Sequence, residues 1–341
     1  MEINPSRILI IDTAWLGDVL FSTALIGAAR AAWPHSEIHF LTAPRARELV
    51  ANHPDLTTIR VFDKRGSEGG FTPLRKLAAE LNAMKFDLVL NAHPSFRSRL
   101  LCSMLVAQVR VGHDGFLSSK AFTHCVHNDL AVEPDHVERR LNLLRAILPV
   151  RHTPPLKIGL TSEERAHAEE FLRVNCPGRN RFLALIPGSA RKTKQWTTSN
   201  FHEIGSAWLN QSPHGCVLVF LGPNESSLKS QFPTGGNSGF IIVEQSLRNC
   251  AALLNRCELA LGNDTGVSFL AIAAGCRKVL VLYGSTQINY QFPPPHRAIA
   301  AGVPCCLPRT GHGEKVCAWT GGAAWCMNQI TRERVLKLIL E

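Results

Sequence analysis

The sequence has no hydrophobic run long enough to cross a membrane. Its best apolar stretches, residues 19–26 and 279–282, are far shorter than the roughly 20 residues that a membrane-spanning helix needs. Glu2, Asp12 and Asp18 lie in or beside the first apolar runs, which disfavours a signal peptide. The eleven cysteines are odd in number and lack the spacing of a disulfide framework, a usage typical of reduced compartments. We therefore expect a cytoplasmic protein.

Motifs for several common chemistries are also missing. Neither G-x-G-x-x-G nor G-x-x-x-x-G-K-[ST] occurs, which argues against ordinary dinucleotide and P-loop sites. No G-x-S-x-G elbow is present for a serine hydrolase, and no D-x-D pair for magnesium. The sequence thus predicts neither a metal nor a cofactor.

The charge balance points toward anionic partners. The 341 residues include 37 Lys and Arg against 27 Asp and Glu, a net charge of +10. Nucleotides, phosphorylated glycans, nucleic acid and acidic membrane surfaces all suit such an excess. No RNP, KH or zinc-finger pattern is present and the basic residues are dispersed, so nucleic acid is not the expected partner.

Apolar strand-like runs alternate with amphipathic helical segments in both halves of the chain. This alternation predicts an α/β fold with parallel sheets. The first series of expected strands comprises residues 7–12, 37–41, 59–62, 87–91 and 108–112. The second comprises residues 182–186, 216–221, 240–243, 258–261 and 279–283.

A proline-rich break separates the two series. Pro149, Pro154 and Pro155 interrupt the pattern, and Thr161 and Glu164 then have capping-box spacing before a helix. We predict two Rossmann-like domains, residues 1–160 and 161–341, facing a central crevice. The last helix, residues 331–340, belongs to the second domain or returns to the first.

The turns after the second-half strands have the composition of a diphosphate site. Small residues that open a helix offer free amides and a positive dipole end to phosphate oxygens, and nearby basic side chains supply charge. Acidic residues there suit sugar hydroxyls. The candidates are Ser189, Ala190, Lys194, Glu225, Asp264, Thr265 and Gly266. A structural alternative stays open, in which Asp264 only caps its helix and the basic run is a solvated loop.

Asp18 is the candidate general base. It follows Gly17 at a helix start, beyond the carboxyl end of the first strand, where ligands bind in open α/β sheets. There it is placed to take a proton from an acceptor hydroxyl. The alternative is a helix-terminal carboxylate that the dipole favours.

Four cysteines gather near the carboxyl terminus around His312. Cys305, Cys306, Cys317 and Cys326 do not have the spacing of a zinc finger. Buried small apolar residues are the simpler interpretation, with zinc as the alternative.

These motifs, in their order and spacing, resemble glycosyltransferase family 9, the lipopolysaccharide heptosyltransferases. The similarity extends over nearly the whole chain. It rests on residues 17–19 (GDV), 187–189 (PGS), 194–196 (KQW), 222–225 (GPNE) and 263–266 (NDTG).

The resemblance implies a GT-B fold and metal-independent, inverting transfer of heptose from ADP-heptose to lipid A–Kdo. It implies Asp18 as the base and Lys194 as the cation that neutralises the diphosphate. Ser189 and Ala190 would lie on the phosphate side and Glu225 at the ribose. Asp264, Thr265 and Gly266 would bind the donor.

Phe269 departs from the family pattern, which has a histidine three residues after the glycine. This leaves the sugar or nucleotide open, so another transferase or an epimerase on the same architecture is a rival. An inactive nucleotide-sugar-binding scaffold and a nucleic-acid-binding or other anion-binding protein are further alternatives.

Basic residues of the first half are the candidates for meeting an acidic, lipid-linked acceptor. They are Arg97, Arg99, Arg110 and Lys120, alongside Gly17. Ordinary surface charge is the alternative interpretation. A lipid acceptor and a basic protein together predict peripheral contact with the inner face of the inner membrane.

Overall fold

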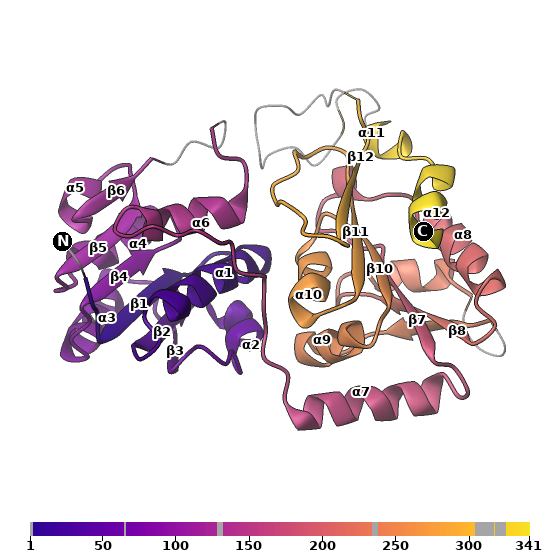
Figure 1. Ribbon diagram of the computed structural model, residues 1–341, viewed down its shortest axis with the longest axis horizontal. Helices are drawn as coiled ribbons and strands as arrows, with labels where there is room; N and C mark the ends of the chain where they lie inside the picture. The colour runs from indigo at the N-terminus through magenta and orange to yellow at the C-terminus, as the bar shows by residue number, and fades with distance from the viewer. Residues whose placement is uncertain (1–2, 65, 128–131, 234–237, 304–316, 318–324) are drawn as a thin grey trace. The chain divides into compact units, whose positions relative to one another are not determined.

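The computed structural model describes residues 3–64, 66–127, 132–233, 238–303, 317 and 325–341. The chain divides into two compact units, Met1–Gly159 and Leu160–Glu341. Each unit is built on a six-stranded sheet in which every pairing is parallel (Figure 1). The predicted α/β class with two parallel sheets is confirmed.

The first sheet has the strand order β3-β2-β1-β4-β5-β6. Its strands are β1 (Arg7–Asp12), β2 (Glu37–Thr42), β3 (Thr58–Val61), β4 (Leu88–Asn91), β5 (Val109–His113) and β6 (His124–Val126). The order reverses between β1 and β4, which makes this the switch point where ligands bind in such sheets. Strand β6 was not predicted, because it has only three residues and they are mostly exposed.

Helices cover both faces of this sheet. Leu9 and Ile11 of β1 pack in one apolar cluster with α3 (Phe71–Ala83), α4 (Phe96–Ser103) and α5 (Ser118–Ala121). Alternate strand residues point to opposite faces, so Asp12 faces the other side. There α1 (Leu16–Ala32) packs against α6 (His136–Arg145). The short η1 (Pro44–Ala46) and α2 (Arg47–Val50) follow β2.

The second sheet has the order β12-β11-β10-β7-β8-β9, with its switch point between β7 and β10. Its strands are β7 (Arg181–Ile186), β8 (Gly215–Phe220), β9 (Phe240–Val243), β10 (Leu259–Asn263), β11 (Lys278–Tyr283) and β12 (Arg297–Ala300). Its helical segments are α7 (Ser162–Asn175), η2 (Lys192–Lys194), α8 (Thr198–Asn210), η3 (Ser226–Gln231), α9 (Leu247–Asn255), α10 (Gly266–Ala274), α11 (Trp325–Asn328) and α12 (Arg332–Leu340).

The capping box predicted for α7 is present. The Thr161 hydroxyl accepts from the Glu164 amide, and the Glu164 carboxylate accepts from the Thr161 amide. Glu164 also forms an ion pair of 2.6 Å with Arg248 of α9. The first helix of the second unit is therefore held to α9 by this ion pair.

The last helix packs within the second unit. Val335 and Ile339 of α12 join the core that contains Trp196, and α12 contacts α8. The Trp196 indole also donates to the Ile330 carbonyl at 3.0 Å. Helix α12 therefore contributes to the core of the second unit.

A buried histidine makes the first unit sensitive to acid. Burial lowers the pKa of His113 to about 4, and the charges of Arg139 and Arg140 add to this effect. Between its ordinary pKa near 6.5 and pH 4 the unfolded chain binds a proton that folded His113 does not, so stability falls as the pH falls. For this one group, the free energy of unfolding changes by at most about 1.4 kcal/mol per pH unit. We expect His113→Asn to reduce the dependence of the free energy of unfolding on pH, measured by urea unfolding between pH 7 and 5.

His152→Asn is the matched control, because His152 is exposed in the same unit. Its pH slope should equal that of the wild type. An unchanged slope in His113→Asn would show that this histidine is not the acid-sensitive group.

Candidate functional site

Three turns meet beyond the carboxyl edge of the second sheet, at its switch point. Lys194 of η2 donates to Oδ2 of Asp264 at 2.5 Å, and the Thr286 hydroxyl donates to the same oxygen at 2.8 Å. The Asp264 side chain is only 4% exposed, whereas the Lys194 side chain is 19% exposed. The aspartate is thus fixed from two sides, and the lysine ammonium has further donors for a ligand.

Asn263 connects the turn after β7 to the end of β10. Its amide donates to the Pro187 carbonyl at 2.8 Å and accepts from the Trp196 amide at 3.0 Å. Trp196 is itself anchored in the core. These bonds hold the turn that carries Lys194 beside Asp264.

Glu225 lies against the same turn. Its Oε2 accepts from the Gly222 amide at 2.8 Å. A Cβ at Gly188 would lie 2.0 Å from its carboxylate, so a larger residue there would require Glu225 to move. The turns after β7 and β8 are therefore in contact through Gly188 and Glu225.

Helix α10 begins at this edge. Thr265 is its N-cap residue, and Gly266 its first residue. Within the described residues, the Thr265 hydroxyl is buried and has no hydrogen-bond partner. Ser189 is partly buried, and its carbonyl accepts from Gln195 at 2.8 Å; Ala190 is exposed. The structure therefore brings the predicted donor-site residues to one edge of the sheet.

Phe269 is buried in a cluster of aromatic rings. Its ring packs edge-on against Tyr290 at 5.9 Å and stacks on Phe292 at 6.2 Å. Tyr283 of β11 joins the cluster through Phe292. Rings fill the position at which the family pattern has a histidine.

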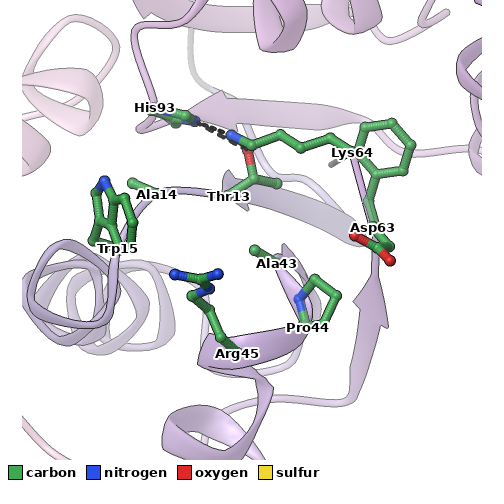
Figure 2. Close-up of a pocket in the computed structure, with 10 residues that line it drawn as sticks. Thr13, Ala14, Trp15, Ala43, Pro44, Arg45, Asp63, Lys64 and His93 are labelled. Carbon is green, nitrogen blue, oxygen red and sulfur yellow. Dashed lines mark hydrogen bonds between the residues drawn. The ribbon is translucent and has the colours of Figure 1, made fainter. Parts of the chain in front are cut away.

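A cavity of about 280 Å³ lies beyond the carboxyl edge of the first sheet (Figure 2). Its walls are the segments that follow β1, β2, β3 and β4. The lining residues are Thr13, Ala14, Trp15, Ala43, Pro44, Arg45, Phe62, Asp63, Lys64 and His93. It therefore occupies the switch point of this sheet.

Two cations and a histidine give the cavity its polarity. Lys64 donates to the Thr13 hydroxyl at 3.1 Å, and that hydroxyl lies 3.0 Å from Nδ1 of His93 (Figure 2). Burial lowers the pKa of His93, which favours the neutral ring. Arg45 stacks over the Trp15 ring at 4.8 Å. The cavity thus offers cationic and aromatic walls to a ligand.

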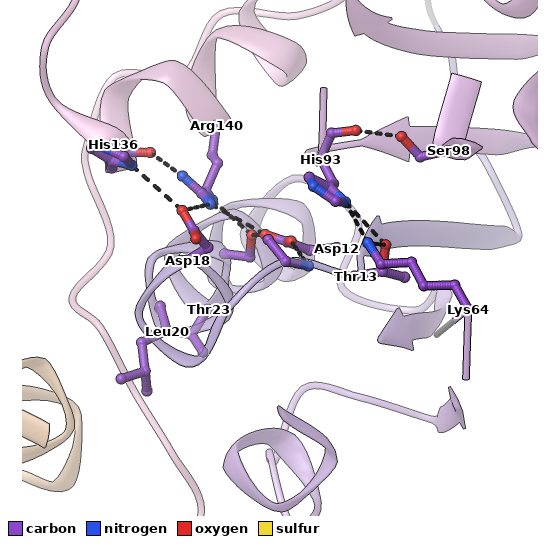
Figure 3. A network of polar contacts seen from close by, with 12 residues as sticks. Asp12, Thr13, Asp18, Leu20, Thr23, Lys64, His93, Ser98, His136 and Arg140 are labelled. Carbon is purple, nitrogen blue, oxygen red and sulfur yellow. Dashed lines mark hydrogen bonds and ion pairs between the residues drawn. The ribbon is translucent and has the colours of Figure 1, made fainter. Parts of the chain in front are cut away.

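Asp18 lies in the first turn of α1 and is bound to α6 (Figure 3). Its Oδ1 is 3.3 Å from Nη2 of Arg140 and 3.7 Å from Nδ1 of His136. Nη2 of Arg140 also lies 3.2 Å from Oδ2 of the fully buried Asp12. Ser22 completes the network, donating to Asp12 at 2.6 Å and accepting from Nε of Arg140 at 2.8 Å.

The network keeps Asp18 ionised. Burial by itself raises the pKa of Asp18, but the hydrogen bond with His136 and the charge of Arg140 outweigh it and hold the pKa well below its usual range. Within the described part of the chain, its hydrogen bond and ion pairs are through Oδ1, and its side chain is 30% exposed. Among the described residues, these contacts do not involve Oδ2.

The predicted acceptor-binding cations are dispersed. Arg97 and Arg99 of α4 donate to backbone carbonyls of neighbouring loops. Arg110 donates to the Ala107 and Ala121 carbonyls, both at 2.9 Å, near the amino end of β5 and thus at the opposite edge. Lys120 is exposed on α5. Gly17 alone lies beside Asp18, on α1.

Sequence reasoning missed most of the first-unit network. Arg140 and His136 are four residues apart, so they share one face of α6. That spacing was a usable signal, as was the position of His93 and Lys64 after the ends of strands. The partnership of Arg140 with Asp12 had no such signal, because 128 residues separate them.

Cys305, Cys306 and His312 lie outside the described residues. Cys317 and Cys326 are buried. In the part of the chain that is described, no group of three or more His, Cys, Asp or Glu is arranged to hold a metal ion. Nor does any helix in that part have the length and apolar character that crossing a membrane requires.

Comparisons with known proteins agree on one family. The profile described as glycosyltransferase family 9 (heptosyltransferase) matches residues 74–308. Lipopolysaccharide heptosyltransferase 2 of Salmonella typhimurium is 20% identical over 304 residues, covering 86% of each chain. Lipopolysaccharide heptosyltransferase 1 of Escherichia coli is 23% identical over 290 residues, covering 82% of this chain and 86% of the relative.

Solved structures show the same fold. A family 9 glycosyltransferase from Veillonella parvula superposes with a TM-score of 0.81 at 24% identity, covering 100% of this chain and 99% of the other. The ADP-heptose lipopolysaccharide heptosyltransferase II of E. coli gives a TM-score of 0.78 at 18% identity, with 98% and 97% covered. The two parallel-sheet units are therefore a GT-B fold.

Proposed function

Because the chain belongs to glycosyltransferase family 9, the heptosyltransferases, we propose that it transfers heptose from ADP-heptose to the lipid A–Kdo inner core of lipopolysaccharide. The observation that carries the proposal is the Lys194–Asp264 pair at the start of α10, opposite Glu225 in the same group of turns. The second unit is the proposed donor site.

Each of the proposed donor-site residues contacts a different part of the nucleotide sugar. Lys194 and the first amides of α10 meet the diphosphate, because both present positive charge at the sheet edge. Glu225 accepts from ribose hydroxyls. Asp264 accepts from sugar hydroxyls, since a carboxylate repels phosphate.

The cavity of the first unit is the proposed acceptor site. Arg45 and Lys64 suit the carboxylate of an acidic sugar such as Kdo, and Trp15 provides a flat face for the ring. Arg97, Arg99 and Arg110 are engaged by backbone carbonyls. The acceptor contacts therefore shift to the two cations that line the cavity.

Asp18 is the proposed base. As the acceptor oxygen attacks the anomeric carbon, its O–H bond breaks and Oδ2 of Asp18 takes the proton. The bond from that carbon to the diphosphate breaks at the same time, and its electron pair leaves with ADP. Attack opposite to the leaving group inverts the anomeric centre through an oxocarbenium-like transition state. Arg140 and His136 position the carboxylate through Oδ1.

The proposed site of action is the cytoplasm, at the inner face of the inner membrane. ADP-heptose is a water-soluble donor, whereas lipid A is anchored in the bilayer. A net charge of +10 favours contact with an anionic leaflet.

ADP release from ADP-heptose tests the function directly. We expect ADP release to require an acceptor, either Kdo–lipid A or its heptosylated form. The acceptor that supports release shows which heptose of the core the enzyme adds. Release of UDP or GDP from the corresponding nucleotide sugars, without release of ADP from ADP-heptose, would contradict the donor assignment. The ring cluster around Phe269 would then be the first place to look.

A further inference from the structure

Three phenylalanines of the first unit are exposed at one edge of its sheet. Phe71, Phe96 and Phe116, the aromatic patch, are 59%, 52% and 72% exposed. They follow the carboxyl ends of β3, β4 and β5 respectively. The rings of Phe96 and Phe116 stack at 6.0 Å with an angle of 23° between their planes. Large rings gathered in this way in water mark an interaction surface.

Two arginines of α4 hold the loops that carry these rings. Arg97 donates to the carbonyls of Gly69 and Gly70, directly before Phe71. Arg99 donates to the Asp114 carbonyl at 3.4 Å, and its guanidinium packs against Gly115, directly before Phe116. Helices α4 and α5 also contact each other (Figure 1). The aromatic patch is therefore built by defined contacts between its loops.

The surroundings of the aromatic patch are basic. Arg97, Arg99 and Lys120 lie in the same segments, and their charge persists when they bind carbonyls. The acids of these segments are Asp63, Glu68 and Asp114; Glu68 lies 3.8 Å from Arg60, and Asp114 lies 2.7 Å from Nδ1 of His127. Exposed rings among cations suit the headgroup region of an anionic bilayer, where aromatic side chains partition and lipid phosphates attract Arg and Lys.

We propose that the aromatic patch docks the first unit on an anionic lipid bilayer. This proposal rests on the proposed function, whose acceptor is lipid-linked. The patch and the cavity share one sheet edge, because His93 in the cavity wall lies in the loop that leads to Phe96. Docking there holds the cavity at the level of the lipid headgroups, where the sugar of the acceptor begins. The charge around the rings favours lipid over a protein partner.

Vesicle flotation tests the docking. The full chain is mixed with vesicles of phosphatidylcholine alone or with added phosphatidylglycerol. We expect the wild type to float with the anionic vesicles and to be released as salt rises. Phe96→Ser/Phe116→Ser should lower the bound fraction about tenfold at limiting lipid. Val106→Ser, at an exposed residue beyond the other end of α4, is the matched control and should bind like the wild type.

Three outcomes would overturn the docking. In the first, the wild type floats with neither kind of vesicle. In the second, the double variant binds the vesicles as well as the wild type does. In the third, the wild type and Val106→Ser are dimers in solution and the double variant is not. The vesicles contain no acceptor, so flotation is independent of the transfer reaction. ADP release with a lipid-free Kdo acceptor is measured separately and should be equal in the wild type and the double variant. Failure of flotation thus remains distinct from failure of the proposed function.

Discussion

Asp18→Asn is expected to abolish most of the transfer while leaving the donor site intact. Loss of a general base lowers the rate by about 10²–10⁴-fold. The substitution keeps the shape of the side chain and an oxygen for Arg140 and His136, so the fold should persist. ADP-heptose binds the second unit in our proposal, and its affinity should therefore change less than twofold. The measurement is kcat for ADP release together with donor binding by calorimetry.

Glu80→Gln is the control for this experiment. Glu80 lies on α3 of the same unit and forms a partly exposed ion pair with Arg60. It should leave kcat unchanged, because such pairs contribute little. Full turnover in Asp18→Asn would remove Asp18 from the reaction. A parallel loss of donor affinity would instead place this carboxylate in donor binding.

The fold was largely predictable from short-range patterns. Buried parallel strands appear as continuous β-branched and apolar runs, and ten of them were located from the sequence, each close to its observed bounds. Strands β6 and β12 were missed. They are short edge strands with exposed residues, so hydrophobic periodicity does not mark them.

The second-unit site was predictable because topology gathers its residues. The carboxyl ends of neighbouring parallel strands lie at one edge, so polar turns after β7, β8 and β10 come together wherever they occur in the chain. Lys194 and Asp264 are 70 residues apart and still meet. No finer knowledge of packing was needed to place them.

The first-unit site was less predictable because its key contacts depend on packing between helices. Counting cations selected Arg97 and Arg99, but their guanidinium groups bind loop carbonyls. Arg140 was not selected, although it is buried and bridges Asp12 to Asp18. Charge in a sequence gives the number of cations, whereas burial decides which of them are committed to carboxylates.

Lys194→Met is expected to have two separable effects. Transfer should fall by about 10²–10³-fold, because a donor that stabilises the leaving diphosphate is lost. The second unit should also lose about 3–5 kcal/mol of stability, since Asp264 is left buried without its cation. Both follow from one contact, and steady-state kinetics and thermal unfolding measure them independently.

Two further variants separate chemistry from folding. In Lys194→Met/Asp264→Asn the buried charge is gone together with its partner, so much of the stability should return while transfer stays low. Lys192→Met is the matched control, because Lys192 is exposed in the same turn and should change neither quantity appreciably. If the double variant recovered transfer along with stability, Lys194 would be a structural partner of Asp264 and the diphosphate would have to be met elsewhere. If it recovers stability alone, the loss of transfer is not a consequence of unfolding, and Asp264→Asn by itself then shows how much of that loss belongs to Lys194, beside the first turn of α10.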